Sequence, residues 1–295
     1  MSSSKIYIAL ACLILFSASA EEPEYKPELN IVYCTVDGKE MKLNAFIPAK
    51  ADKPTAAMVE IHGGWWSGGS PAKDCKGGNF EAYRRIGAAI FTTSYRLGKD
   101  GGFPQNIRDC RNAVRFIRKN AARFNIDPER IGVSGVSAGG HLSLMVAMVP
   151  EEFDDGGPTD DLKGVSAKVC NCFSYVGPTD FVQQWTESAD ARRYHAVLFR
   201  GVEPTTDEGK ALYLKMSPIF HVRKDLPPLL ICQGEKDPIV NHAHGSTLHE
   251  KLKAAGADST YWLTAGGGHG FPGGPGFKKV LDDFLERTLG VAKSK

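Results

Sequence analysis

The chain has 295 residues, of which 42% are hydrophobic and 24% are charged, a composition typical of a globular enzyme with one α/β domain. A chain of this length buries enough apolar surface to fold without a disulfide scaffold. Its formal net charge is +2 and its basic residues are spread along the chain, so we expect it to bind neither nucleic acid nor an acidic membrane surface.

The N-terminus has the pattern of a secretory signal peptide. Lys5 precedes an apolar run from Ile6 to Phe16, and Ala18-Ser19-Ala20 supplies the small residues of a cleavage site. The apolar run is shorter than the roughly 20 residues of a membrane span, so we expect no stable membrane insertion. The sequence predicts a signal peptide over 1–20, cleavage after Ala20, a secreted or periplasmic location, and a catalytic domain over 21–295.

Removal of this peptide leaves six cysteines, an even number that permits disulfides in an exported protein. Cys170 and Cys172 stand two apart in an apolar run, so a strand would place both on one face, where they are poorly placed to bond each other. The absence of a Cys-x-x-Cys pair argues against a zinc site. Buried free thiols and one or two disulfides both remain open for Cys34, Cys75, Cys110, Cys170, Cys172 and Cys232.

Beyond the leader, a predicted hairpin is followed by alternating strands and helices. Residues 31–36 and 41–47 alternate apolar and polar around Asp37-Gly38, a pattern typical of two antiparallel strands. The later elements are predicted, in chain order, as strand 56–61, helix 80–86, strand 88–93, helix 104–124, strand 130–135, helix 138–148, strands 169–175 and 229–233, helix 242–255, strand 260–263 and helix 277–289. This order predicts an α/β fold with a mostly parallel sheet of about eight strands and helices on both faces.

Residues 181–216 interrupt this alternation. They combine aromatic and charged side chains with weak helical periodicity. They follow a predicted strand, and open α/β sheets bind ligands at the carboxyl ends of their strands. We interpret 181–216 as a small cap over the site; the alternative is an ordinary surface excursion.

The turn Gly135-Val136-Ser137-Ala138-Gly139 joins a predicted strand to a predicted helix. A serine hydroxyl is a weak nucleophile unless it is held clear of the backbone beside a base. The G-x-S-x-G elbow achieves this with a sharp turn that only small neighbours allow. Ser134 does not fit the pattern, because Val136 occupies the position of the second glycine. The sequence therefore predicts Ser137 as the nucleophile.

The loop His62-Gly63-Gly64-Trp65-Trp66 directly follows the predicted strand 56–61. Glycine allows a backbone N–H to approach a substrate oxygen closely. The N–H groups of Gly64, Trp65 and Ala138 are therefore predicted to form the oxyanion hole. We interpret His62 as a structural histidine rather than a base.

A serine nucleophile needs a base, and the base needs an orienting acid. His269 stands in a glycine-rich loop after the last predicted strand, and Asp237, followed by Pro238, comes after another strand. These two are predicted as base and acid, with Glu235 as the rival acid. The order Ser137, Asp237, His269 is the order expected in α/β-hydrolases. The other histidines weighed as bases are His141, His195, His242 and His249.

Taken together, these motifs resemble the esterase/lipase branch of the α/β-hydrolases, from about Thr55 to Leu289. That branch includes the BD-FAE (bacterial feruloyl-esterase-like) group, hormone-sensitive-lipase-like enzymes and kynurenine formamidases. Trp65 stands where lipase-like relatives have a third glycine, which favours the H-G-G-x-W branch. The matching motifs are His62 to Trp66, Tyr95-Arg96-Leu97, Asn125 to Ile131, Gly135 to Gly140, Gly177 to Asp180, Ser217-Pro218, Pro227 to Leu230, Gly234 to Pro238 and Gly268 to Phe271.

The resemblance and the signal peptide together predict a secreted serine carboxylesterase that needs no metal or organic cofactor. Its substrates are expected to be small or polysaccharide-linked esters, such as acetyl or feruloyl groups. Trp66, Trp185 and Phe271 are the expected substrate contacts. Two alternatives stay open: an amide hydrolase of formamidase or peptidase type on the same triad, and a non-catalytic binding protein on a hydrolase fold.

Overall fold

The structure is a computed structural model, and it describes residues 23–150, 153, 160–270 and 273–291. The predicted signal peptide and Phe271 therefore lie outside the described residues.

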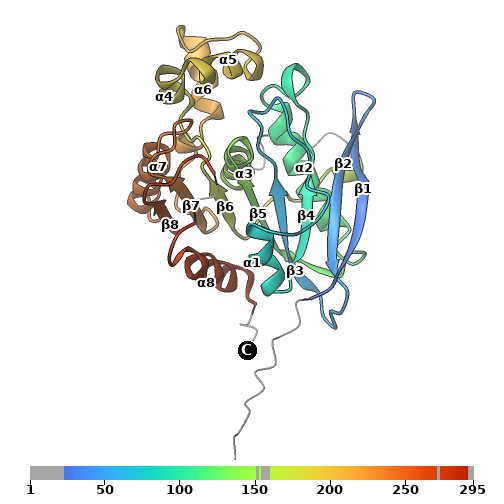
Figure 1. The fold of residues 1–295 in the computed structure, drawn as a ribbon. Coiled ribbons are helices and arrows are strands. Elements are labelled where there is room, and N and C mark those ends of the chain that lie inside the picture. Colours follow the sequence, from blue (N-terminus) through green and yellow to red (C-terminus); the bar gives the residue numbers. More distant parts are fainter. Residues whose placement is uncertain (1–22, 151–152, 154–159, 271–272, 292–295) are drawn as a thin grey trace, which may run out of the picture.

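Eight strands form one sheet in the order β1-β2-β4-β3-β5-β6-β7-β8 (Figure 1). β1–β2 and β2–β4 pair antiparallel, and every other pair is parallel. This arrangement confirms the predicted α/β-hydrolase fold with a mostly parallel sheet. The strands are β1 (Tyr25–Val36), β2 (Lys39–Pro48), β3 (Thr55–Ile61), β4 (Ala89–Thr93), β5 (Ile126–Val136), β6 (Cys172–Tyr175), β7 (Leu229–Gly234) and β8 (Ser259–Thr264).

Helices cover both faces of the sheet, as expected where parallel strands are joined by crossover helices. Side chains of α1 and α8 share one apolar core with the sheet, and side chains of α2, α3 and α7 share the core on the other face. Every residue of α3 is buried, because this helix lies between the sheet and its neighbours. These helices are α1 (Asn79–Arg85), α2 (Gln105–Lys119), α3 (Ala138–Met148), α7 (Ala243–Ala254) and α8 (Phe277–Leu289).

The boundaries of several elements differ from the prediction: β1 begins at Tyr25 rather than at residue 31, and β6 at Cys172 rather than at residue 169. α2 ends at Lys119 rather than at residue 124, and β5 begins at Ile126 rather than at residue 130. Asn125, with φ 49°, turns the chain between them, and Ile126 then pairs with Thr55 of β3. Helical periodicity continues through this turn because Ala121 and Phe124 are also buried.

Residues 181–216, here called the 181–216 segment, form three helices: α4 (Phe181–Glu187), α5 (Ala189–Leu198) and α6 (Asp207–Met216). Figure 1 shows them grouped at one end of the molecule, above β6 and β7. Each helix begins with a side-chain N-cap, supplied by Asp180, Ser188 and Thr206. Such caps satisfy free N–H groups, and they explain how helices form here despite the weak apolar periodicity.

All six cysteines in the described part of the chain are free thiols, and five of them are buried. The structure thus favours the free-thiol alternative over disulfides. None of the described helices is both long enough and apolar enough to cross a membrane.

Candidate active site

The turn between β5 and α3 holds Ser137 in a strained conformation. Its φ is 56° and its ψ is −118°, values that L-residues rarely adopt. A Cβ added to Gly135 would lie 2.4 Å from the carbonyl oxygen of Gly139, and one added to Gly139 would lie 2.0 Å from that of Ile61. The tight packing of backbone against backbone is the physical reason why both flanking positions are glycine.

Ser137, His269 and Asp237 form one hydrogen-bonded chain. Nε2 of His269 lies 2.9 Å from Oγ of Ser137, and Nδ1 lies 2.8 Å from Oδ2 of Asp237. The side chain of Asp237 is fully buried and that of His269 is 18% exposed. The backbone N–H groups of Ile239 and Val240 donate to the other carboxylate oxygen, Oδ1 of Asp237, at 2.8 and 3.0 Å. The imidazole is therefore oriented by a fixed carboxylate and is positioned to accept the serine proton.

The loop that carries His269 is held against the loop that carries the buried carboxylate. The N–H of Gly266 donates to Oε2 of Glu235 at 2.7 Å, and the N–H of Lys236 donates to the carbonyl of Gly267 at 2.7 Å. Glu235, the rival acid of the sequence analysis, thus bonds the backbone of the histidine loop and not the imidazole.

The glycine-rich loop after β3 passes beside the serine. A Cβ added to Gly63 would lie 3.5 Å from Cβ of Ser137. Gly64 and Trp65 both have positive φ, 119° and 54°. Among the described residues, none accepts a hydrogen bond from the N–H of Gly64, Trp65 or Ala138. These three predicted donors are therefore available to a substrate oxygen.

The two tryptophans of this loop point to different surroundings. The ring of Trp65 stacks on Tyr194 of α5, with centroids 4.5 Å apart and 14° between the planes. Trp66 is only 2% exposed, and its Nε1–H donates to Nδ1 of His141 at 3.2 Å. This placement differs from the expected substrate contact, because a side chain buried in the core offers almost no surface to a substrate.

Trp185, the second expected substrate contact, is half-buried within the 181–216 segment. Its ring lies 6.3 Å from that of His195 and 6.0 Å from that of Tyr213. Tyr194, which is not among the expected substrate contacts, lies beside the loop after β3 because it stacks on Trp65. Only its contact with Trp65 distinguishes it from the other aromatic residues of the segment, and no sequence pattern reveals that contact.

His141 joins three parts of the site. Besides accepting from Trp66, it places Nε2 3.0 Å from the carbonyl oxygen of Met216, at the end of α6. Burial lowers the pKa of His141 to about 3, so the ring is neutral and donates through Nε2. This side chain links the loop after β3, α3 and the 181–216 segment.

Two further histidines are also held by partners of their own. His62 stacks on Tyr95 with centroids 4.4 Å apart, and its Nδ1 lies 2.7 Å from the carbonyl oxygen of Gly63. His195 places Nε2 3.0 Å from Oε1 of Gln184, and burial lowers its pKa to about 3. Both are packing residues in this structure, as the interpretation of His62 expected.

A buried polar cluster lies beneath the elbow. Ser134 is fully buried, and its hydroxyl donates to Oε2 of Glu60 at 2.5 Å and accepts from Tyr83 at 2.9 Å. Burial raises the pKa of Glu60 to about 7. Ser134 thus belongs to the interior, which agrees with its exclusion as the nucleophile. The described residues contain no group of three or more His, Cys, Asp or Glu side chains arranged to hold a metal ion.

Comparison with protein families matches residues 43–252 to the BD-FAE family model. A similar curated protein is Carboxylesterase NlhH of Mycobacterium tuberculosis, 35% identical over 250 residues that cover 79% of this chain and 73% of NlhH. The chain spans only about half the length of other curated relatives, for example 54% of Esterase LipC from the same organism.

Solved esterase structures share the fold along most of the chain. A truncated carbohydrate esterase from gut microbiota has a TM-score of 0.76 and 26% identity, over 91% of this chain and 98% of the other. A thermophilic esterase from the Planctomycetes species Thermogutta terrifontis has a TM-score of 0.72 and 27% identity, over 93% and 96%.

Proposed function

Because the chain belongs to the BD-FAE family of α/β-hydrolases, we propose that it is a serine carboxylesterase that works through an acyl-enzyme on Ser137. The observation that carries this proposal is the hydrogen-bonded chain Ser137–His269–Asp237, with links of 2.9 and 2.8 Å. These distances lie in the range at which a serine passes its proton to a base.

In the first half of the reaction, Oγ of Ser137 attacks the ester carbonyl while Nε2 of His269 takes the hydroxyl proton. The carbonyl oxygen becomes an oxyanion. The buried Asp237 carboxylate stabilises the imidazolium that forms and stays ionised itself. His269 then returns the proton to the departing alcohol oxygen, so the C–O bond breaks and the acyl group remains on Ser137.

In the second half, a water molecule attacks the acyl-enzyme. His269 takes a proton from this water, and the new tetrahedral intermediate collapses with transfer of that proton to Oγ of Ser137. The carboxylic acid leaves and the free enzyme is restored. The N–H groups of Gly64, Trp65 and Ala138 stabilise both oxyanions, and each such donor lowers the barrier by about 3 kcal/mol.

We infer that the ester is carried by a carbohydrate. Support comes from the similarity to a carbohydrate esterase from gut microbiota and from the stacked pair Trp65–Tyr194 next to the predicted oxyanion loop. Aromatic rings offer an apolar surface for the C–H face of a sugar. Acetyl and feruloyl groups are the acyl groups we propose, and export through the predicted signal peptide would bring the enzyme to such polymers.

Hydrolysis of p-nitrophenyl acetate, measured with wild type and Ser137→Ala, tests the mechanism. We expect turnover by the wild type and a loss of at least about 10³-fold in the variant, with an unchanged circular dichroism spectrum. Activity that survives the substitution would refute Ser137 as nucleophile. A folded but inactive wild type would favour the binding-protein alternative. Hydrolysis of N-formylkynurenine without hydrolysis of esters would favour the amidase alternative.

A further inference from the structure

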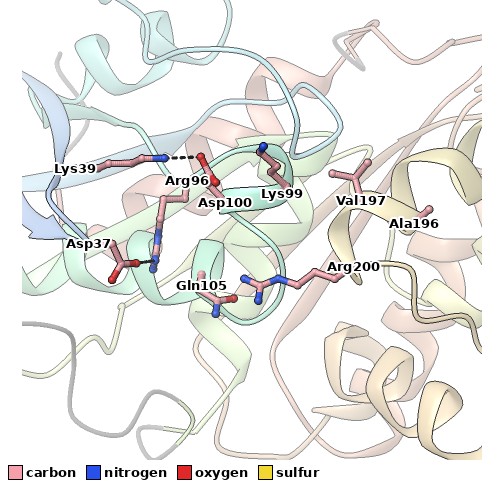
Figure 2. A pocket seen from close by; sticks show the side chains of 9 residues that line it. All are labelled: Asp37, Lys39, Arg96, Lys99, Asp100, Gln105, Ala196, Val197 and Arg200. Carbon is pink, nitrogen blue, oxygen red and sulfur yellow. Dashed lines mark hydrogen bonds and ion pairs between the residues drawn. The ribbon is translucent and has the colours of Figure 1, made fainter.

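A charged pocket of about 530 Å³ lies where the 181–216 segment meets the core of the domain. Figure 2 shows its lining: Asp37 and Lys39 where β1 turns into β2, residues between 96 and 105, Ala196 and Val197 of α5, and Arg200, which follows the end of that helix. Four of the lining residues are cationic and two are anionic, so the lining has a net charge of +2 (4 − 2). They are Lys39, Arg96, Lys99 and Arg200, against Asp37 and Asp100.

Two of the four cations already have anionic partners. Lys39 places Nζ 2.5 Å from Oδ2 of Asp100. Arg96 makes a two-pronged contact with Asp109, a fully buried carboxylate behind the pocket, through Nε and a terminal nitrogen, each at 2.9 Å. Its other terminal nitrogen lies 3.3 Å from the exposed carboxylate of Asp37. The carboxylates around the pocket are therefore already paired with Lys39 and Arg96.

Lys99 and Arg200 have no ion-pair partner among the residues that the structure describes. Both are exposed residues. In Figure 2 the side chain of Arg200 extends from the 181–216 segment toward Gln105. Arg200 has φ 54°, a conformation uncommon for a residue with a long side chain, and backbone in this region persists only where the surroundings enforce it.

The pocket adjoins the predicted oxyanion loop through two contacts. The N–H of Gly98, the residue before Lys99, donates to the carbonyl oxygen of Trp66 at 2.8 Å. Tyr194, which stacks on Trp65, precedes Val197 of the pocket lining by three residues, so the two side chains share one face of α5. The pocket thus begins about one helical turn beyond the Trp65–Tyr194 stack.

We propose that this pocket is a subsite for an anionic substituent, a carboxylate or a sulfate, on the carbohydrate part of the ester substrate. Arg200 and Lys99 bind the anion through charge-assisted hydrogen bonds. Val197, 37% exposed, and Ala196 give the wall against which a sugar ring packs. The assignment rests on the proposed esterase function, because it is the carbohydrate half of the ester that would reach the pocket.

The test compares three acetylated oligosaccharides that differ at one position: one with a uronic acid, one with that carboxyl reduced to an alcohol, and one with a sulfate there. For wild type we expect kcat/KM for the uronate to exceed that for the neutral form by about tenfold, which corresponds to about 1.4 kcal/mol. In Arg200→Gln and Lys99→Gln this ratio should fall toward one. Arg200→Lys, which keeps the charge, should restore most of it, and Lys210→Gln, an exposed change on α6 outside the pocket, should leave it as in wild type.

Binding of the deacetylated oligosaccharides, measured by isothermal titration calorimetry, requires no turnover. The uronate or the sulfate, whichever is preferred, should bind wild type about tenfold more tightly than the neutral form and should lose this advantage in Arg200→Gln. Equal affinity and equal kcat/KM for the three sugars would overturn the subsite while leaving the esterase intact. Binding that depends on Arg200 in a protein that hydrolyses none of the esters would instead overturn the proposed function and retain an anion site.

Discussion

At the scale of single residues, the two interior carboxyl groups of Asp237 and Glu60 have different surroundings. The side chain of Asp237 is fully buried, and it accepts two backbone N–H groups and faces Nδ1 of His269, so its hydrogen bonds fix its orientation. Glu60, also in the interior, faces uncharged groups: the hydroxyls of Ser134 and Tyr83 and the side chain of Asn79. The first carboxylate is suited to orient a base, and the second is suited to bind a proton.

The protonation of Glu60 gives the stability a measurable pH dependence. Burial raises its pKa from 4.5 to about 7. Between these values the folded protein retains the Glu60 proton and the unfolded chain has lost it, so the free energy of unfolding falls as the pH rises from about 4.5 to about 7. Glu60→Gln should flatten this dependence and should be more stable relative to wild type at pH 8 than at pH 5.

Urea denaturation at pH 5 and pH 8 measures this difference. Glu129→Gln, a change to an exposed carboxylate away from the site, is the matched control and should follow the pH dependence of wild type. The same slope in wild type and Glu60→Gln would show that Glu60 ionises normally in the folded state.

At the scale of elements, the site is assembled by side chains that connect loops to helices. His141 of α3 accepts from Trp66 in the loop after β3 and contacts the carbonyl of Met216 at the end of α6. The indole N–H of Trp66 is buried, and a buried donor without an acceptor costs about 1–3 kcal/mol of stability. This contact therefore stabilises the loop after β3.

His141→Phe should lower the free energy of unfolding by about 1–3 kcal/mol, because it leaves both the indole N–H and the carbonyl of Met216 without a partner. Trp66→Phe in the same background removes the unsatisfied donor and should restore part of the loss. Chemical denaturation of wild type, both single variants and the double variant measures the coupling. Strict additivity of the two substitutions would contradict the hydrogen bond.

At the scale of the whole molecule, the free cysteines indicate that the domain is stabilised by its apolar core and not by disulfides. All six described cysteines are free, and five are buried; burial raises the pKa of Cys110 and Cys232 well above the usual value. A domain of this size has an apolar core large enough to fold without disulfides. Its five buried thiols should therefore react only when the chain unfolds, and the partly exposed Cys170 should react first.

Thiol titration without reductant should give six equivalents per chain in guanidinium chloride if the signal peptide has been removed, since Cys12 is the seventh cysteine. The folded protein should react far more slowly. A count of four or fewer after unfolding would show that disulfides form in the purified protein. The mass of the purified chain tests the predicted cleavage independently, with Glu21 as the expected first residue.

From the sequence alone came the predicted catalytic parts: the elbow around Ser137, the glycine loop after β3, and the order of acid and base. These are local patterns, because a turn that requires small residues and a strand that ends in a functional residue leave a signature within a few positions. It also gave the sheet and most helix positions, through apolar periodicities of two and of about 3.6.

Which side chains of distant elements meet became clear from the three-dimensional structure alone. It placed Trp66 in the core on His141, brought Tyr194 of α5 onto Trp65, and gathered Lys99 and Arg200 at one pocket. In the structure α2 also ends at Lys119, although the apolar helical pattern of the sequence continues past this residue. The chain then turns at Asn125 into β5. In each case the cause is packing between elements far apart in the chain, which no local pattern of residues encodes.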